Sequence, residues 1–163
     1  MAIEKVIKYF ETLGCAEKIK QLEVSSATVE LAAQALGCEG ARIAKTLSFL
    51  VDDAAVLIVT AGDMKIDNPK FKAFFHTKAR MLSPDQVDSL VGHSIGGVCP
   101  FAVNEGVDVY LDISMQRFAT VFPAAGSSNS AIELTCDELE KHSCSKGWVD
   151  LCKGWQDDDN KEG

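Results

Sequence analysis

Residues Ala41–Gly62 read ARIAKTLSFLVDDAAVLIVTAG and contain two apolar runs joined by Asp52-Asp53. The runs, Ile43–Val51 and Ala54–Thr60, are rich in Val, Ile, Leu and Thr and are bounded by turn-forming residues, which predicts two paired strands. Nearly every position is apolar rather than alternating with polar ones, so we expect both faces of the sheet to be covered.

One lysine interrupts this apolar pattern. Lys45 is the only cation between Arg42 and Lys65, and it lies at the start of the first strand. Its side chain can pack its aliphatic part on the sheet and keep the ammonium in water. Alternatively, Lys45 is a functional cation directed into a cleft. The other motifs of the chain are needed to choose between these interpretations.

Length and composition indicate one soluble domain. The chain has 163 residues, of which 47% are hydrophobic and 25% charged, enough for a single hydrophobic core. No apolar run approaches the roughly 18 to 20 residues of a membrane helix. The N-terminus, MAIEKVIKYFETLG, is amphipathic and lacks the apolar segment of a signal peptide. We therefore expect a cytoplasmic protein with no membrane partner.

The cysteines and glycines do not predict a metal or a cofactor. There is no CxxC pair and no histidine at zinc-finger spacing, so free thiols are expected. A cysteine nucleophile would need a base such as His76, His93 or His142, and the sequence leaves that possibility open. No GxxxxGK[ST] or GxGxxG motif supports ATP or dinucleotide chemistry. The six cysteines are Cys15, Cys38, Cys99, Cys136, Cys144 and Cys152.

The formal net charge of −8 argues against a general nucleic-acid binder, but the charge is uneven. Between residues 61 and 80, five cations accompany only Asp63 and Asp67. Such a basic patch can contact phosphates weakly and with marked salt dependence, or it is a solvated face. The cations are Lys65, Lys70, Lys72, Lys78 and Arg80.

The remaining elements predict one α/β domain over residues 1–155, with helices packed on a mixed sheet and an acidic, frayed tail at 156–163. Glycine, proline and capping residues delimit them. Helices are expected at Ala2–Thr12, at Val29–Leu36 capped by Ser26 or Thr28, from Asp67 to His76, from Ser83 to Gly92 and from Cys136 to His142. Extended segments are expected at Ile19–Val24, Val107–Ile113, Thr120–Ala124 and Ala131–Leu134, and a loop at Gly92–Phe101.

Four pieces in this order resemble the YbaK family of aminoacyl-tRNA deacylases, free-standing relatives of the editing domain inserted in bacterial prolyl-tRNA synthetases. The resemblance covers roughly Glu23 to Leu139. The pieces are IAKTL at Ile43–Leu47, the hairpin with its AGD end, GGVCP at Gly96–Pro100 and FPAAGSSNSAIEL at Phe122–Leu134.

The resemblance implies a single α/β domain with a curved, mixed sheet flanked by helices. It implies a hydrolase without cofactor or metal that removes a wrong amino acid from tRNA in trans, with mischarged tRNA and prolyl-tRNA synthetase as partners. Lys45 corresponds to the family's key functional residue. The substrate-binding positions implied are Gly96, Gly97, Val98, Cys99 and Pro100 of the GxxxP loop, Gly126 and Ser127 of the late glycine segment, and Asp112 on the preceding strand.

The sequence departs from the family at Cys99, where many relatives carry Ser or Thr before the proline. A role for the loop backbone survives this change, whereas a role for the hydroxyl does not. The preferred amino acid is therefore harder to infer.

The chemistry suits this set of residues. Hydrolysis of an activated ester needs orientation and oxyanion stabilisation, and glycine N–H groups can approach a carbonyl closely. With an ordinary pKa of about 10.4, Lys45 is a cation that positions the substrate rather than a base. Water, or the thiol of a cysteinyl substrate, is then the nucleophile. Cysteine and alanine on proline tRNA are the foremost expected substrates.

Two alternatives remain from the sequence. One is a module that binds tRNA ends or a synthetase without turnover. The other is a thiol-dependent enzyme that uses Cys99 beside His93.

Overall fold

The hairpin predicted from the apolar runs forms the middle of the sheet in the computed structural model, which describes residues 2–22, 28–93 and 98–153. Strands β2 (Ile43–Val51) and β3 (Ala54–Ala61) pair antiparallel from Ala44–Ala61 to Val51–Ala54. Asp52 and Asp53 between them have φ angles of 50° and 66°. Two successive positive φ angles are typical of a type I′ turn, which matches the twist of the flanking strands.

Six strands form the main sheet, in the order β8-β6-β2-β3-β5-β9. β2 pairs parallel with β6, β3 with β5, and β5 with β9, whereas β2–β3 and β6–β8 are antiparallel, so the sheet is mixed. The outer strands are β5 (Asp108–Asp112), β6 (Thr120–Pro123), β8 (Leu134–Thr135) and β9 (Trp148–Val149). Two small pairs accompany it: β1 (Ile19–Gln21) with β7 (Ser130–Ile132), and β4 (Lys65–Ile66) with β10 (Cys152–Lys153).

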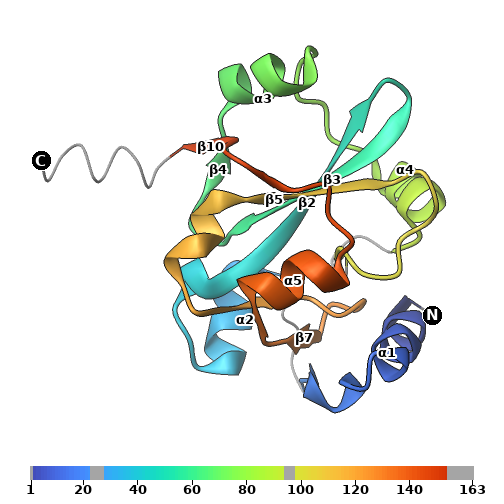
Figure 1. Cartoon of the computed structure of the whole chain (residues 1–163), viewed down its shortest axis with the longest axis vertical. Helices are drawn as coiled ribbons and strands as arrows, with labels where there is room; N and C mark the ends of the chain where they lie inside the picture. Colours follow the sequence, from blue (N-terminus) through green and yellow to red (C-terminus); the bar gives the residue numbers. More distant parts are fainter. Residues whose placement is uncertain (1, 23–27, 94–97, 154–163) are drawn as a thin grey trace, which may run out of the picture.

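Helices lie on both faces of this sheet. Figure 1 shows α3 at one end of the molecule, far from α1 and α5. The helices are α1 (Ala2–Thr12), α2 (Val29–Leu36), α3 (Asn68–Phe75), α4 (Pro84–Gln86) and α5 (Cys136–His142). The predicted fold class, a single α/β domain with a curved mixed sheet flanked by helices, is confirmed. In the described ranges, no helix is both long and apolar enough to cross a membrane.

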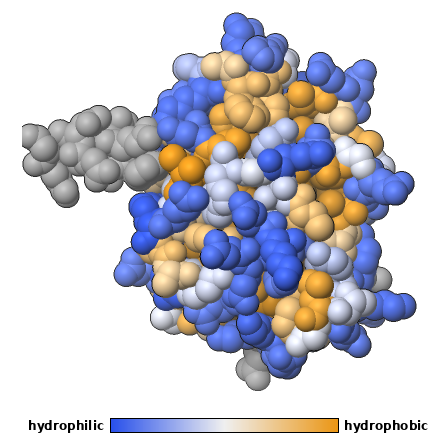
Figure 2. All heavy atoms as spheres, in the orientation of Figure 1, coloured by the Kyte–Doolittle hydropathy of each residue, from blue (hydrophilic) through white to orange (hydrophobic). Residues whose placement is uncertain are grey.

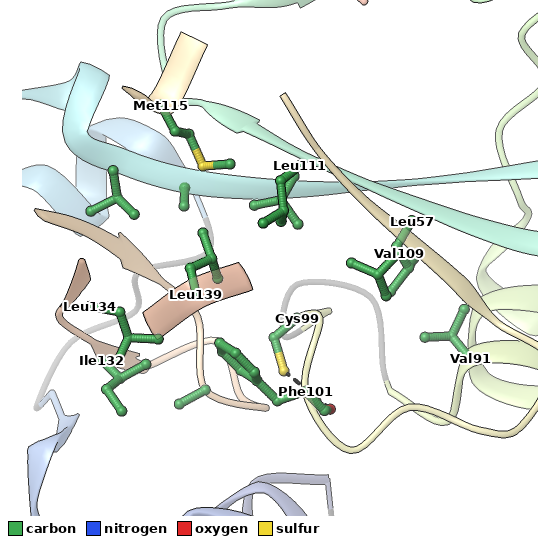
Figure 3. Packing of buried hydrophobic residues seen from close by; sticks show 14 of the residues in the cluster. Leu57, Val91, Cys99, Phe101, Val109, Leu111, Met115, Ile132, Leu134 and Leu139 are labelled. Atoms are coloured by element: carbon green, nitrogen blue, oxygen red, sulfur yellow. Dashed lines mark hydrogen bonds between the residues drawn. The ribbon is translucent and has the colours of Figure 1, made fainter. Parts of the chain in front are cut away.

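The two faces of β2 and β3 contribute to different clusters. Leu57 belongs to the largest cluster, which also contains Phe10 of α1 and Leu139 of α5 (Figure 3). Ile58 points to the other face, into a cluster with Phe71 of α3. A third, small cluster joins α2 to the start of β2 and to β6. The expectation that both faces are covered is therefore confirmed.

Some boundaries differ from the sequence-based prediction. The helix expected from Ser83 to Gly92 is α-helical only over Pro84–Gln86, behind a complete capping box at Ser83. It continues as one π-helical turn, η3 (Val87–Val91), and the Gly92 N–H donates to the Val87 carbonyl at 3.3 Å. Thr28 is the N-cap of α2, while the alternative cap, Ser26, and the expected tail at 156–163 lie outside the described residues.

Candidate functional site

A cavity of about 320 Å³ opens where β2 and β6 part. These parallel strands pair only through Ile43–Phe122 and Ala44–Pro123. Farther along, another segment takes the same edge of β2: the Leu82 N–H donates to the Ser48 carbonyl at 3.1 Å. Between these two attachments the β2 edge faces the cavity rather than a strand. Sequence reasoning missed this gap because it depends on pairings between distant segments.

Thr46 lies in the middle of that open edge. Ala44 and Ser48, the residues two positions away on either side, direct their backbone groups to the same edge, so strand alternation directs the Thr46 backbone there too. Its side chain lines the cavity, and within the described residues its buried hydroxyl has no hydrogen-bond partner. A buried hydroxyl without a partner is costly, and a polar ligand in the cavity would satisfy it.

Lys45 lines the cavity from the face of β2 that carries Ile43 and Leu47. Ile43 packs with α2 and Leu47 with the cluster beneath α3, so Lys45 lies between the two covered regions. The side chain is half-buried, and its Nζ donates a hydrogen bond to the Met64 carbonyl. Burial lowers the pKa of Lys45 below its ordinary value, an effect that nearby Asp63 opposes. Lys45 is thus a partly buried, hydrogen-bonded cation at the cavity wall, and its functional role stays a prediction.

The turn that carries the Met64 carbonyl is fixed from two sides. A Cβ added to Gly62 would lie 2.2 Å from the Gly40 carbonyl oxygen, so only glycine fits there. On the other side, Arg117 donates two hydrogen bonds to Asp63, at 2.7 and 3.1 Å. Arg117 Nε also donates a hydrogen bond to the Ser114 carbonyl at 2.7 Å. The Asp63–Arg117 ion pair therefore helps position the carbonyl that holds Lys45. No local sequence signal indicated Arg117.

The GxxxP loop reaches the cavity through Val98, which lines it, while Gly96 and Gly97 lie outside the described residues. Cys99 and Pro100 are buried behind that wall. Figure 3 shows Cys99 among the core side chains beside Phe101. The described residues of the loop thus contribute one apolar side chain to the cavity and otherwise pack into the core.

Cys99 and His93 are neighbours, as the thiol alternative requires, but both are sealed in the core. Cys99 Sγ lies 3.6 Å from His93 Nε2, which is 2.8 Å from the Phe101 carbonyl oxygen. Burial raises the pKa of the Cys99 thiol to about 12 and lowers the pKa of His93. A thiol that stays protonated and does not line the cavity is a poor nucleophile. The geometry therefore argues against the thiol-dependent alternative.

Gly126 and Ser127 contribute indirectly, through a residue that sequence reasoning did not single out. Gly126 has a φ of 100°, and the Ser127 N–H donates to Ser130 Oγ at 3.2 Å. The two serine hydroxyls also share a hydrogen bond of 2.8 Å. Ser130 is 1% exposed and lines the cavity. The turn thus positions Ser130 at the cavity wall.

Asp112 lies away from the cavity. Its carboxylate is fully buried and accepts hydrogen bonds from the Leu151 N–H at 2.8 Å and the Ser114 N–H at 2.9 Å. Ser114 Oγ in turn accepts a hydrogen bond from the Ala61 N–H at 3.2 Å. Cys152 lies near both Asp112 and Lys45: burial raises the pKa of its thiol, Asp112 raises it further, and Lys45 opposes the shift. The predicted substrate contact of Asp112 stays a prediction. What the structure shows is a buried support for the turn that follows β3.

Together these residues can bind a small ligand that carries both a polar group and a short apolar side chain. Lys45 supplies a positive charge, and Thr46 and Ser130 supply hydroxyl groups. Much of the remaining wall is apolar, with Ala32 and Phe122 among its members. In the described ranges, no three His, Cys, Asp or Glu side chains gather as metal ligands.

Comparison with known proteins gives a consistent set of relatives. A model of the aminoacyl-tRNA editing domain family matches residues 23–142. The chain is 52% identical to the uncharacterized protein YwhH of Bacillus subtilis (strain 168), over 96% of this chain and 100% of YwhH. It is 28% identical to the proline–tRNA ligase of Leuconostoc citreum (strain KM20), over 70% of this chain but only 20% of the ligase.

A solved structure also matches closely. The crystal structure of a candidate trans-editing enzyme for prolyl tRNA synthetase superposes with a TM-score of 0.84 and 30% sequence identity. The match covers 94% of this chain and 98% of that protein.

Proposed function

Because the chain belongs to the aminoacyl-tRNA editing domain family, we propose that it hydrolyses the ester bond of mischarged tRNA in trans, foremost Cys- or Ala-tRNA(Pro). The observation that carries the proposal is Lys45, which lines the cavity and whose ammonium is held by the Met64 carbonyl. Action in trans is supported by the likeness to a free-standing candidate editing enzyme over nearly its whole length.

The cavity provides electrostatic stabilisation at a preorganised position. Lys45 is held by the Met64 carbonyl, so its charge is in place before the substrate arrives. A fixed charge beside the ester carbonyl or the adjoining ribose lowers the energy of the developing oxyanion without reorganisation. Because the ammonium has no lone pair, it orients and stabilises while water attacks. A cysteinyl substrate offers its own thiol as an alternative nucleophile.

The size of the cavity favours a small amino acid. Its volume of about 320 Å³ must hold the aminoacyl group and part of the terminal adenosine, which leaves little room for a large side chain. Apolar walls distinguish substrates that differ by one methylene by only about 1–3 kcal/mol. We therefore expect larger amino acids to be excluded, and cysteine, alanine and serine to be separated less sharply.

The test is a panel of tRNAs charged with cysteine, alanine, serine, threonine or proline, each incubated with the pure protein. Rapid release of cysteine or alanine from proline tRNA, with prolyl-tRNA untouched, is the expected result. Alanine on its own tRNA is the matched control, because it presents the same ester on a different acceptor stem. Retained binding without release from any member would instead support a non-catalytic module for tRNA ends.

A further inference from the structure

A second hollow, of about 440 Å³, lies beside α3 and is lined by two lysines. Its lining comes from the first turns of the helix, Asn68, Pro69 and Lys72, and from Lys78 and Ala79 of the following segment. Figure 2 shows hydrophilic residues at the end of the molecule that carries α3, beside an apolar area. None of these residues lines the cavity that contains Lys45.

The two ammonium groups of the hollow are available for a ligand. Lys72 and Lys78 are exposed, and within the described ranges no carboxylate lies within 4.0 Å of either ammonium. The neighbouring acids are engaged elsewhere: Asp67 caps α3 by accepting the Lys70 N–H at 3.1 Å, and Asp150 pairs with the Lys70 ammonium at 3.0 Å. The hollow is thus a local positive site on a chain with a net charge of −8.

Two short connections place this hollow next to the cavity. Ala79 of the hollow precedes Met81 of the cavity by two residues, which an extended chain spans in at most about 7 Å. Asn68 follows Met64, whose carbonyl holds Lys45, by four residues, or at most about 14 Å. Met81 is 59% exposed between the two sites and offers an apolar surface to a base. A neighbouring nucleotide can bridge such a separation.

We propose that this hollow binds a backbone phosphate of the single-stranded 3′ end of the tRNA, upstream of the terminal adenosine, and so presents the ester to Lys45. Lysine ammonium groups recognise phosphate as point charges. The acidic remainder of the surface repels RNA, so the strand is directed to this edge. The inference rests on the proposed function, because the RNA end is that of its substrate.

The first experiment compares kinetics on two substrates. The double variant Lys72→Gln/Lys78→Gln should raise KM for mischarged tRNA about tenfold and leave kcat within about twofold, since it loses phosphate contacts made before the chemistry. Hydrolysis of the corresponding aminoacyl-adenosine, which has no upstream phosphate, should be unchanged. The matched control, Lys8→Gln/Lys141→Gln, removes the same charge from exposed positions on α1 and α5, far from α3 (Figure 1).

The second experiment separates the inference from the proposed function. A short single-stranded RNA ending in CCA is titrated with each protein and followed by fluorescence anisotropy at several salt concentrations. The hollow variant should bind about tenfold more weakly than the control and with a shallower salt dependence, by about 0.7 in slope for each lost phosphate contact.

Each outcome decides one claim. Binding that depends on the two lysines in a protein without deacylase activity would keep the inference and overturn the proposed function. Equal binding and equal KM in the hollow variant and the control would overturn the inference, as would a wild-type protein that does not bind the RNA at low salt.

Discussion

Lys45 and Cys99 are two reactive side chains in opposite situations. Lys45 is half-buried, lines the cavity and has its ammonium hydrogen-bonded to the Met64 carbonyl. Cys99 lies 3.6 Å from a histidine, the usual partner of a catalytic thiol, yet it is completely buried. In both cases burial disfavours the charged form, lowering the pKa of Lys45 and raising that of Cys99.

The difference lies in what faces each group. The cavity gives Lys45 room for a substrate, whereas the Phe101 carbonyl and the core occupy the surroundings of Cys99 and His93. A pair of residue types with catalytic potential is therefore not sufficient evidence for a site. An accessible cavity with a preorganised charge is the stronger indication.

The largest expected effect concerns Lys45. Lys45→Ala should lower kcat/KM for the preferred mischarged tRNA by at least about 100-fold, because the site loses the ammonium that stabilises charge at the reacting ester. Circular dichroism and thermal unfolding should show a folded protein. The control is Lys146→Ala, an exposed lysine that is 3.8 Å from Asp108, and it should behave like wild type. A folded Lys45→Ala protein with full activity would refute the assignment.

A smaller effect is expected when the Met64 turn loses its support. Arg117→Met removes both hydrogen bonds to Asp63 and should lower kcat about tenfold with little change in KM, since Arg117 positions Lys45 without touching substrate. Lys18→Met breaks a comparably exposed ion pair, with Glu138, and should leave kcat unchanged. If both variants reduce kcat equally, the loss reflects general stability rather than positioning.

The pH profile should reveal the lowered pKa of Lys45. The ammonium is the active form, so activity falls as the pH rises through its pKa, and burial places that fall below the ordinary value of about 10.4. Initial rates are measured after subtraction of spontaneous ester hydrolysis. In Lys45→Arg the guanidinium stays charged, and the descending limb should disappear from whatever activity remains. An unchanged limb in that variant would assign it to another group.

The smallest effect should come from the sealed thiol. Cys99→Ser should retain activity within about threefold, since the hydroxyl can still donate to the Phe101 carbonyl and no step uses the thiolate. Iodoacetamide should not alkylate Cys99 in the native protein, so it should not inactivate the protein through this residue. If Cys99→Ser and Cys99→Ala are both folded and both inactive, the thiol mechanism is favoured instead.

Local signals were sufficient for the central hairpin, for the helix start at Asp67, for the helix from Cys136 to His142, and for the fold class. They could not give β4, β9 and β10, because strands of two residues carry no periodicity and exist only through pairing with distant partners. The helix expected from Ser83 to Gly92 has those two residues as its caps, but its second part is π-helical rather than α-helical. Capping residues fixed its start, but the tertiary environment of Val87–Val91 determined how the turn was completed.

The candidate site, too, could be predicted from the sequence only in part. The break in an apolar strand marked Lys45, but its hydrogen-bond acceptor and the Arg117 support are 19 and 54 residues from their partners in the chain. Asp112 was predicted at the substrate, which stays untested, and the sequence did not indicate that its carboxylate accepts hydrogen bonds from backbone N–H groups in the interior. Residue type and position on a strand do not reveal which groups donate hydrogen bonds to a carboxylate.

Chemical rescue tests the central claim most directly, because it restores only the ammonium in the cavity. Lys45→Ala is assayed on the preferred mischarged tRNA with increasing ethylammonium, and free amino acid is measured separately from any amide formed by the amine itself. Tetramethylammonium, which cannot donate a hydrogen bond, is the control. The account predicts a saturable recovery of hydrolysis with ethylammonium alone. No recovery in a folded variant that still binds tRNA, or equal recovery with both cations, would contradict it.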